Sequence, residues 1–522
     1  MTFRVYLLLF ILALIPPMVI AQFQPAPGYL DSDYYFAGGI QLVNGKGFSE
    51  PYMWNYLDGS TSLPHPSHGY WQPLASIVAA LGMWLTGSAT YASARIFFIL
   101  IAGLVAPVTA LLAYNFTKRR DLAVTSALLA IFSVYSAPFV GVTDNFGIFM
   151  LLGGLYFILA LQLIHNPSVI RNWFLLGLLA GFMTLSRSDG LLWLAVTFLF
   201  VLWRAPGISF AKLGKSTFIH SLLTLLGFLT VMAPWYARNI NVYGSIMAPG
   251  GSRALWLSNY DQTFIYPPDL LNKESFLATG WQEILSIRLK ALSQNFQSAF
   301  AAHGAIVLFP FILIGIYAHR KDELVKLIGL AWLILFFVMT FIFPLAGARG
   351  AFFHAGAAFQ PMWWVLAPLG LESVMAYLRT KNWGDDQARV VFRSGLVMIA
   401  VILTVFVVYL KLFSIGWSEG EENYSAIESF LKEKGIEQND IVIVRNAPGY
   451  YLETGRSALP IPYGDERTVL EVAKQFHANY LVLETEAVLE PMKDLFDDPN
   501  GNPDFVFLGE LNDAKFYRIE FK

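Results

Sequence analysis

The chain has 522 residues, of which 56% are hydrophobic and 14% are charged, and its net charge is −2. Soluble globular chains carry roughly 25% charged residues. This deficit, with a mean hydropathy of +0.52, indicates a polytopic membrane protein. The near-neutral net charge does not indicate the basic surface that a nucleic-acid-binding protein needs. The absence of cysteine excludes disulfides, thiolate metal sites and cysteine nucleophiles.

The first apolar segment, residues 2–21, has two interpretations. Val19-Ile20-Ala21 is a tolerable cleavage site, so the segment could be a signal peptide. We favour a retained helix, because Arg4 is the only charge before the apolar run and the run is longer than that of a usual signal peptide. The remaining helices also orient consistently with this helix in place.

Hydropathy predicts about eleven membrane-spanning helices. Their expected ranges are residues 3–21, 92–114, 123–138, 146–164, 173–185, 191–203, 218–236, 305–318, 327–344, 361–378 and 395–413. The two spans around Arg187 are short, as expected for tilted or thin spans. Three long connections, residues 22–91, 237–302 and 345–360, are expected to be loops, and the first includes a short amphipathic piece at residues 71–85.

Basic residues gather in the connections on one side of this helix set. They are Lys118, Arg119, Arg120, Arg171, Arg204, Lys212, Lys215, His319, Arg320, Lys321, Arg379, Lys381, Arg389 and Arg393. The positive-inside rule makes that side cytoplasmic. The opposite side then holds Asp31, the three long loops and everything after Ser414. We therefore expect an integral protein of a prokaryotic cytoplasmic membrane, with its C-terminal part outside.

Composition changes after Ser414, and residues 416–522 are expected to form a small extracytoplasmic α/β domain. Helices are predicted at residues 423–434 and 468–476 and strands at residues 440–444, 480–484, 505–508 and 515–519. The last two strands are expected to form a hairpin around Asn512-Asp513. The domain has no nucleotide-binding glycine fingerprint.

Two carboxylates, Asp31 and Asp33, follow the first apolar segment within residues 28–37, Gly-Tyr-Leu-Asp-Ser-Asp-Tyr-Tyr-Phe-Ala. Acids at a membrane edge commonly just face water, so the pair alone is equally compatible with a structural and a functional role. Aromatic residues flank the pair in the sequence. The segment over residues 40–48 is expected to begin as a helix, which ends at Gly45. This surrounding pattern favours a functional site.

The order of motifs over most of residues 1–378 resembles the GT-C glycosyltransferases, in particular the protein O-mannosyltransferases and the bacterial lipid A aminoarabinose transferases. The resemblance begins with the acidic motif before a tyrosine and the following Asn44-Gly45-Lys46-Gly47-Phe48. Further matches are Tyr70-Trp71-Gln72-Pro73-Leu74, Thr143-Asp144-Asn145-Phe146, Leu176-Gly177-Leu178-Leu179-Ala180-Gly181, Leu185-Ser186-Arg187-Ser188-Asp189-Gly190-Leu191 and Pro234-Trp235-Tyr236-Ala237-Arg238-Asn239. The order and spacing of these motifs carry the resemblance.

The resemblance implies that residues 1–415 form a GT-C catalytic domain. It also implies a polyprenyl-phosphate sugar donor, such as dolichyl-phosphate mannose, and inversion at the anomeric carbon. The acceptor hydroxyl needs a general base, and Asp31 matches the catalytic acid of the family. Asp33 and Asp144 are expected to orient the acceptor or to share a divalent ion, Mg²⁺ or Mn²⁺, with Asp31. The acceptor is open between protein, glycolipid and glycan.

The leaving group of this reaction is a lipid phosphate, whose developing charge needs fixed cations. Arginine forks fit phosphate best, and we expect Arg238 and Arg349 to bind it, with His354 as a helper. The other candidates for substrate binding are Arg187, Gln72 and Tyr35. For each arginine the alternative is anchoring to lipid headgroups.

Two positions depart from the family pattern. The family has Glu where this chain has Ser32, and it has a phosphate-contacting Lys where this chain has Gln72, which brings no charge. His65 and His68, spaced i and i+3, could bind a metal. A proline-bearing loop without nearby ligands instead favours a solvated or acceptor-contacting loop.

Two other functions compete with the glycosyltransferase. A transporter or lipid flippase tends to place ionisable residues and broken helices near the membrane midplane. Here the membrane interior is almost free of charge and the candidate residues gather at one edge, which favours interfacial chemistry. A non-enzymatic anchor for the C-terminal domain would need one or two helices and no acids at Asp31 and Asp33.

Overall fold

The computed structural model describes residues 1–204, 214–382, 385–485 and 488–521, so Lys212 lies outside the described residues. The chain forms two compact units. Unit 1 comprises Met1–Phe23, Arg95–Arg238 and Arg288–Gly416, and unit 2 comprises Gln24–Ala94, Asn239–Ile287 and Trp417–Lys522.

Unit 1 is helical. Its helices are α1 (Phe3–Ala21), α5 (Ile96–Thr117), α6 (Arg120–Ile131), α7 (Phe146–His165), α8 (Ile170–Ser186), α9 (Leu191–Arg204), α14 (Leu308–Ala318), α15 (Glu323–Phe337), α16 (Pro344–Ala346), α17 (Phe352–Gly356), α18 (Gln360–Thr380) and α19 (Asp386–Tyr409). Most of α10 (Lys215–Tyr243) and the second half of α13 (Trp281–Gln297) also belong to it. π-Helical turns lie at Ser298–His303, Val338–Ile342, Gly347–Ala351 and Leu410–Ser414.

A helix overlaps every range predicted to span the membrane. Among the described residues, six helices are long and apolar enough to cross a bilayer, at Phe3–Ala21, Tyr91–Thr117, Phe146–His165, Lys215–Tyr243, Glu323–Ile342 and Asp386–Ser414. A seventh span arises if Trp281–His303 and Leu308–Ala318, bent by 95°, count as one. The protein is therefore an integral membrane protein. The total of eleven spans stays a prediction, because the other helices are shorter or less apolar.

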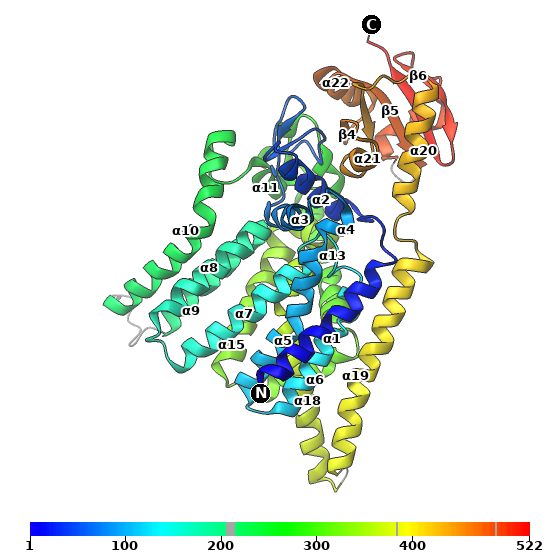
Figure 1. The fold of residues 1–522 in the computed structure, drawn as a ribbon. Coiled ribbons are helices and arrows are strands. Elements are labelled where there is room, and N and C mark those ends of the chain that lie inside the picture. Colours follow the sequence, from blue (N-terminus) through cyan, green and yellow to red (C-terminus); the bar gives the residue numbers. More distant parts are fainter. Residues whose placement is uncertain (205–213, 383–384, 486–487, 522) are drawn as a thin grey trace. The chain divides into compact units, whose positions relative to one another are not determined.

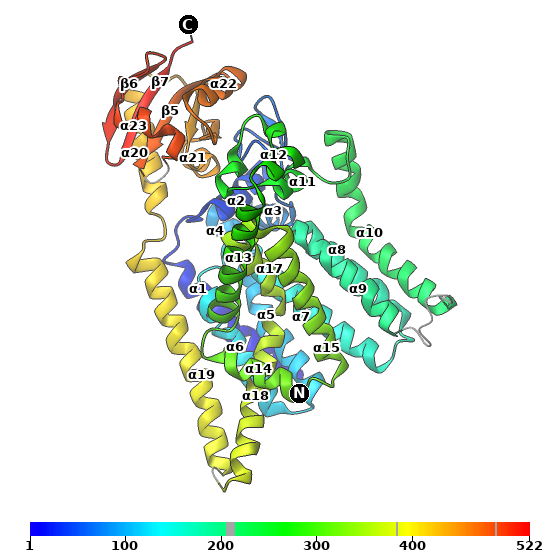
Figure 2. The same cartoon turned by 180° about the vertical axis from the view of Figure 1, so that it is seen from behind.

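Glycines let neighbouring helices of unit 1 approach backbone to backbone. A Cβ at Gly315 of α14 would lie 2.3 Å from a carbonyl oxygen of α18, and one at Gly370 of α18 would lie 1.8 Å from a carbonyl oxygen of α14. Gly177 of α8 and Gly227 of α10 form a similar pair. Small residues at such crossings are typical of helix pairs in lipid. Figure 1 shows α7, α8 and α9 side by side, and Figure 2 shows α14 beside α18.

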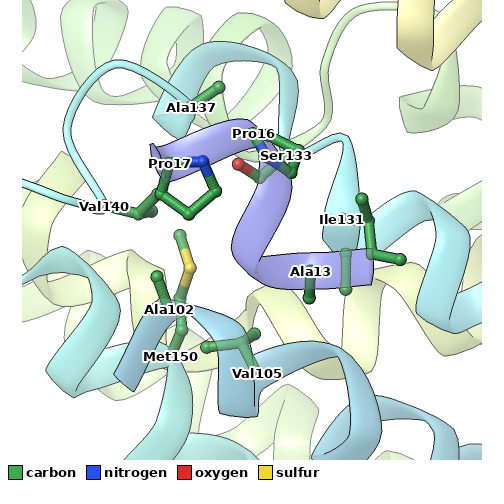
Figure 3. A pocket seen from close by; sticks show the side chains of 11 residues that line it. Ala13, Pro16, Pro17, Ala102, Val105, Ile131, Ser133, Ala137, Val140 and Met150 are labelled. Atoms are coloured by element: carbon green, nitrogen blue, oxygen red, sulfur yellow. The ribbon is translucent and has the colours of Figure 1, made fainter. Parts of the chain in front are cut away.

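Pro16 and Pro17 lie inside α1 and border a hollow of unit 1 with about 380 Å³ of empty space, part of it open to solvent (Figure 3). The other lining residues are Ala13, Ala102, Val105, Ala130, Ile131, Ser133, Ala137, Val140 and Met150. The side chains that line it are apolar apart from the Ser133 hydroxyl. The hollow therefore suits hydrocarbon and offers no charge to a phosphate.

The connection expected over residues 237–302 contains helices. α10 continues to Tyr243, and α13 forms a helix of 17 residues between the short helices of this segment and α14. Large apolar side chains recur every three or four residues along α13 and are 36–75% exposed: Trp281, Leu285, Leu289, Leu292 and Phe296. Hydropathy missed this helix because polar residues on its other faces lower the average.

Unit 2 contains the segments around the candidate acids. They are α2 (Leu30–Val43), β1 (Ser49–Glu50), β2 (His65–Pro66), α3 (Leu74–Thr86), α4 (Tyr91–Ala94), α11 (Pro249–Arg253) and α12 (Lys273–Ala278). The rest of the unit consists of α20 (Glu419–Glu433), β3 (Ile441–Val444), α21 (Ala447–Thr454), β4 (Ala458–Pro460), α22 (Glu466–Phe476), β5 (Ala478–Glu484), α23 (Lys493–Asp497), β6 (Phe505–Leu511) and β7 (Ala514–Ile519).

The predicted C-terminal α/β domain is confirmed as a five-stranded mixed sheet in the order β4-β3-β5-β7-β6. β3 pairs parallel with β4 and β5, whereas β7 pairs antiparallel with β5 and β6. Figure 2 shows β5, β6 and β7 together. Asn512, with φ of 54°, turns the predicted hairpin. The sequence reading missed β4 and α21, which are short.

The first loop contributes to the core of this sheet domain. Met53 and Tyr56 are buried together with Leu459, Phe476 and Leu481. The Met53 amide donates to the carbonyl of Ala458 at 3.0 Å, which extends the sheet edge at β4. The Tyr56 hydroxyl donates to the carbonyl of Pro460 at 2.5 Å. Residues after Trp417 and residues of the first loop therefore fold as one body.

We expect the apolar face of α13 to lie in lipid, because lipid is the only surrounding that favours such exposed side chains. The chain has no native cysteine, so single cysteines report cleanly. In proteoliposomes, a membrane-impermeant maleimide should label Lys290→Cys readily and Leu289→Cys poorly, with equal labelling of both after denaturation. Equal labelling of the folded variants would contradict this placement.

Candidate functional site

Asp31 lies in the first turn of α2 and is partly buried. Gly28 precedes this helix with φ of +83°, and a Cβ there would lie 2.4 Å from the Trp417 indole. The Trp417 indole N–H donates to the carbonyl of Ala26 at 3.0 Å. The start of α2 is therefore fixed by the backbone conformation of Gly28 and by the packing of this segment on Trp417. A helix N-terminus stabilises a carboxylate such as Asp31 in its ionised form.

Asp33, two residues on, is 1% exposed and binds the C-terminal domain. Its Oδ2 accepts a hydrogen bond of 2.7 Å from the Asn446 side-chain amide. The Asn446 Oδ1 in turn accepts from the Gly449 amide at 3.1 Å and so caps the start of α21. A Cβ at Gly449 would lie 3.0 Å from Asp33 Oδ2. Asp33 therefore joins α2 to α21, whatever further role it has.

The other candidates of unit 2 are buried in an aromatic cluster next to α2. Tyr35 is 2% exposed, and its ring centroid lies 5.8 Å from that of Trp71. Gln72 is 7% exposed, and within the described parts of the chain its Oε1 has no hydrogen-bond partner. Tyr35 thus packs as part of the core, whereas Gln72 keeps an unused acceptor.

A solvated loop at His65 and His68 is wrong, since they are only 5% and 1% exposed, whereas contact with an acceptor stays a prediction. His65 Nδ1 lies 3.1 Å from Asp58 Oδ2. His68 Nε2 lies 3.1 Å from the Ser76 hydroxyl. Both rings find polar partners inside the fold, which the spacing in the sequence does not reveal.

In unit 1, Asp144 and His354 form a pair at the starts of α7 and α17. The Asp144 side chain is fully buried, and its Oδ2 lies 3.1 Å from His354 Nε2. His354 Nδ1 lies 3.0 Å from the Gly350 carbonyl, and the imidazole stacks on the Phe146 ring at 4.1 Å. The two ring nitrogens of His354 thus contact the Asp144 carboxylate on one side and the Gly350 carbonyl on the other.

Arg187 at the end of α8 is paired with Asp189, a residue that the sequence reading passed over. The guanidinium approaches the carboxylate at 2.6 Å and also donates to the Ala351 carbonyl at 3.3 Å. The Ser186 hydroxyl donates to Asn145 Oδ1 at 2.5 Å. These contacts join the end of α8 to the start of α7 and to the segment before α17.

Arg349 lies exposed on the π-helical turn Gly347–Ala351, where Gly350 has φ of +130°. Only glycine adopts that φ readily, which explains Gly350. A Cβ at Gly347 would lie 2.0 Å from the Met339 carbonyl oxygen, which explains the second glycine. Arg238 lies 4.7 Å from the Trp235 ring centroid, a cation–π contact within α10. Unit 1 thus gathers Asp144, Arg187 and His354 through shared contacts, with Arg349 two residues before Ala351.

The comparison with known proteins gives no matching family model and no matching curated protein. Solved structures do match. ArnT from Cupriavidus metallidurans bound to undecaprenyl phosphate is 11% identical, with a TM-score of 0.56 over 99% of this chain and 98% of that one. The archaeal oligosaccharyltransferase AglB from Archaeoglobus fulgidus, in complex with an inhibitory peptide and a dolichol-phosphate, is 13% identical, with a TM-score of 0.56 over 92% and 69%.

The chain has the GT-C fold. The expected class, a GT-C helical membrane protein with a C-terminal α/β domain, is thereby confirmed. A further structure of the Archaeoglobus fulgidus enzyme, in complex with Zn and sulfate, matches with a TM-score of 0.52 at 12% identity over 92% of this chain and 68% of that one. At such identities the GT-C likeness concerns the fold.

The Asp33–Asn446 hydrogen bond should be a measurable part of the stability of unit 2. Removing one partner of a buried, charged hydrogen bond costs about 1–3 kcal/mol. We expect Asp33→Ala and Asn446→Ala each to speed proteolysis of the C-terminal domain in the full chain. The double variant should cost less than the sum of the single variants. Strictly additive effects in this cycle would show that the contact carries no energy.

Proposed function

We propose that the protein is a membrane glycosyltransferase. It transfers a sugar from a polyprenyl-phosphate donor to an acceptor hydroxyl on the outer face of a prokaryotic cytoplasmic membrane. The observation that carries this proposal is the GT-C fold over nearly the whole chain, shared with ArnT bound to undecaprenyl phosphate. The motif order from Asp31 to Asn239, in a chain with six or more membrane spans, supports it.

In this reaction the acceptor oxygen attacks the anomeric carbon as the bond from that carbon to the phosphate oxygen breaks. The acceptor proton passes to the carboxylate of Asp31, and the lipid phosphate leaves with the bonding electrons. Attack opposite the leaving group inverts the anomeric centre. Asp31 suits this role because it is partly accessible and sits at a helix start, whereas Asp33 is buried against Asn446.

The leaving phosphate needs a cation on an accessible surface that the lipid headgroup can reach. The guanidinium of Arg187 is already paired with Asp189, so we assign it to holding the segment around Ala351. Arg349, exposed on that segment, is the better candidate for the phosphate, with Arg238 as the second. Gln72 has an acceptor oxygen, Oε1, without a hydrogen-bond partner among the described residues. It therefore suits a hydroxyl group of the sugar better than a phosphate, which has no proton to donate.

A divalent cation fits the donor atoms of unit 1 in part. Asp144 and His354 offer a carboxylate and an imidazole, a set that suits Mn²⁺ or Zn²⁺ better than Mg²⁺. Asp144 and His354 would hold the ion, which supplies Lewis-acid stabilisation of the leaving phosphate. Of the other predicted ligands, Asp33 already accepts from Asn446, and Asp31 keeps its role as base.

Asp31→Asn should abolish the base without changing the size of the side chain. We expect transfer from a radiolabelled undecaprenyl-phosphate sugar to fall by about two orders of magnitude or more, because general-base catalysis typically contributes that much. Binding of the donor should be retained. Asp494→Asn, an exposed acid in α23, is the matched control and should stay active. Full activity of Asp31→Asn would refute the assignment.

Arg349→Ala and Arg238→Ala should weaken binding of undecaprenyl phosphate. Loss of a charge-assisted hydrogen bond of about 1.5–3 kcal/mol corresponds to roughly ten- to a hundredfold in Kd. Arg518→Ala on β7 removes a comparable arginine outside the site and serves as the control. Unchanged affinity in both variants would place the phosphate elsewhere.

A further inference from the structure

A buried charged cluster lies in the loop between α2 and α3 and takes no part in the proposed chemistry. β1 and β2 pair antiparallel, with Glu50 directly opposite His65. Asp58 lies on the loop between the two strands. The side chains of all three are at most 4% exposed. Three ionisable groups buried this deeply are costly unless they pair with one another.

His65 is surrounded by acceptors. Its Nδ1 lies 3.1 Å from Asp58 Oδ2, and its Nε2 lies 2.9 Å from the Tyr52 carbonyl and 3.5 Å from Glu50 Oε1. Asp58 is itself fixed by the Ser60 amide and hydroxyl, both at 2.9 Å. An imidazole facing acceptors at both nitrogens is favoured as the cation. Burial alone would lower the pKa of His65, but Asp58 and Glu50 raise it to about 9.

Glu50 connects this cluster to α2. Its Oε1 accepts a hydrogen bond of 3.2 Å from the Tyr34 hydroxyl. The Tyr34 oxygen in turn accepts from the His68 amide at 2.8 Å. Burial raises the pKa of Glu50 to about 7, the charge of His65 opposes that shift and the charge of Asp58 adds to it. The titratable groups facing Glu50 are thus His65, Asp58, Tyr34 and Tyr52.

Tyr34 follows Asp31 by three residues, which places both on neighbouring positions of one helix face. Its ring is fully packed between other rings: those of Trp71 at 5.0 Å and His68 at 5.3 Å. The hydroxyl is the one polar end of this buried side chain. Where Glu50 holds that hydroxyl, it fixes the rotation and height of the first turn of α2.

We propose that Glu50, held by His65 and Asp58, is a positioning residue that acts through Tyr34 to fix the turn of α2 carrying Asp31. The proposal rests on the proposed function in taking Asp31 as the base. Ionised Glu50 is the stronger acceptor and attracts the His65 cation. Burial raises the pKa of Glu50, but the hydrogen bond from Tyr34 lowers it. Breaking that bond while Glu50 stays buried therefore raises its pKa and favours uptake of a proton, so the first turn of α2 loosens as pH falls through the range where Glu50 titrates.

Hydrogen–deuterium exchange of the full chain in nanodiscs tests this directly. At pH 8, Glu50→Gln should speed exchange of the amides of residues 33–37 about tenfold relative to wild type. At pH 5.5, where Glu50 is protonated, the two proteins should exchange alike. Tyr34→Phe should speed exchange at both pH values. Tyr517→Phe, which removes a buried hydroxyl that bonds the Leu495 carbonyl in the same unit, should leave α2 unchanged.

Equal exchange of α2 in Glu50→Gln and wild type at pH 8 would overturn the proposal. Loss of protection throughout β5 as well would also overturn it, because that is general destabilisation.

A second arm separates this proposal from the proposed function. With an undecaprenyl-phosphate sugar as probe, Glu50→Gln should lower kcat, leave KM for the donor unchanged and remove the change of rate near pH 7. If wild type transfers no sugar, the proposed function fails while the exchange data still decide the role of Glu50. If Glu50→Gln transfers sugar at the wild-type rate and pH profile, the positioning role is refuted.

Discussion

The hydrogen bond from the Asn446 amide to the buried carboxylate of Asp33 is the contact on which the arrangement of unit 2 depends. A buried carboxylate must be satisfied by donors, and this one accepts a hydrogen bond from a residue 413 positions away in the chain. The Gln41 amide adds a second link, donating to the Tyr451 hydroxyl at 2.7 Å. The C-terminal domain is therefore built onto the helix that carries the candidate base. These two hydrogen bonds give the C-terminal domain a structural role, which is to hold α2 in place.

Buried polar and charged side chains are paired in unit 1 as well. Arg187 is satisfied by Asp189 and Asp144 by His354, and each pair also bonds a backbone group of a neighbouring segment. These pairs tie together the helix ends where the family-like motifs lie. Each motif is weak evidence for a site when taken alone. The contacts strengthen that evidence, because they join Asp144, Arg187 and His354 within one unit.

Much of the fold could be predicted from the sequence, because long apolar runs indicate membrane-spanning helices directly. The first helix spans the predicted residues 3–21, and the strand at residues 441–444 lies within its predicted range. α13 escaped because an amphipathic helix in a membrane protein has no long apolar run. β4 and α21 escaped because both are short and the edge strand ends in Pro460. Their position depends on Tyr52 and Met53 from the first loop, a pairing that local sequence does not encode.

The candidate site was predictable as a set of residue types, but their partners were not. Asp31 and Asp144 follow from motif order, and Arg349 and His354 were predicted as cations on the outer side of the membrane. Asn446, the partner of Asp33, and Glu50, the partner of Tyr34, lie on other elements, and only the fold brings each pair together. Asp189 could have been found, since an acid two residues after an arginine at a helix end is a natural ion pair.

The most direct test of the central claim follows the bond between sugar and phosphate in the purified protein in proteoliposomes. Mass spectrometry of an undecaprenyl-phosphate sugar incubated with candidate acceptors counts free undecaprenyl phosphate and glycosylated acceptor, and NMR gives the anomeric configuration of the product. The account predicts one lipid phosphate released for each sugar transferred, with inverted configuration. Movement of the intact lipid-linked sugar across the membrane without cleavage of that bond would contradict it and indicate a flippase.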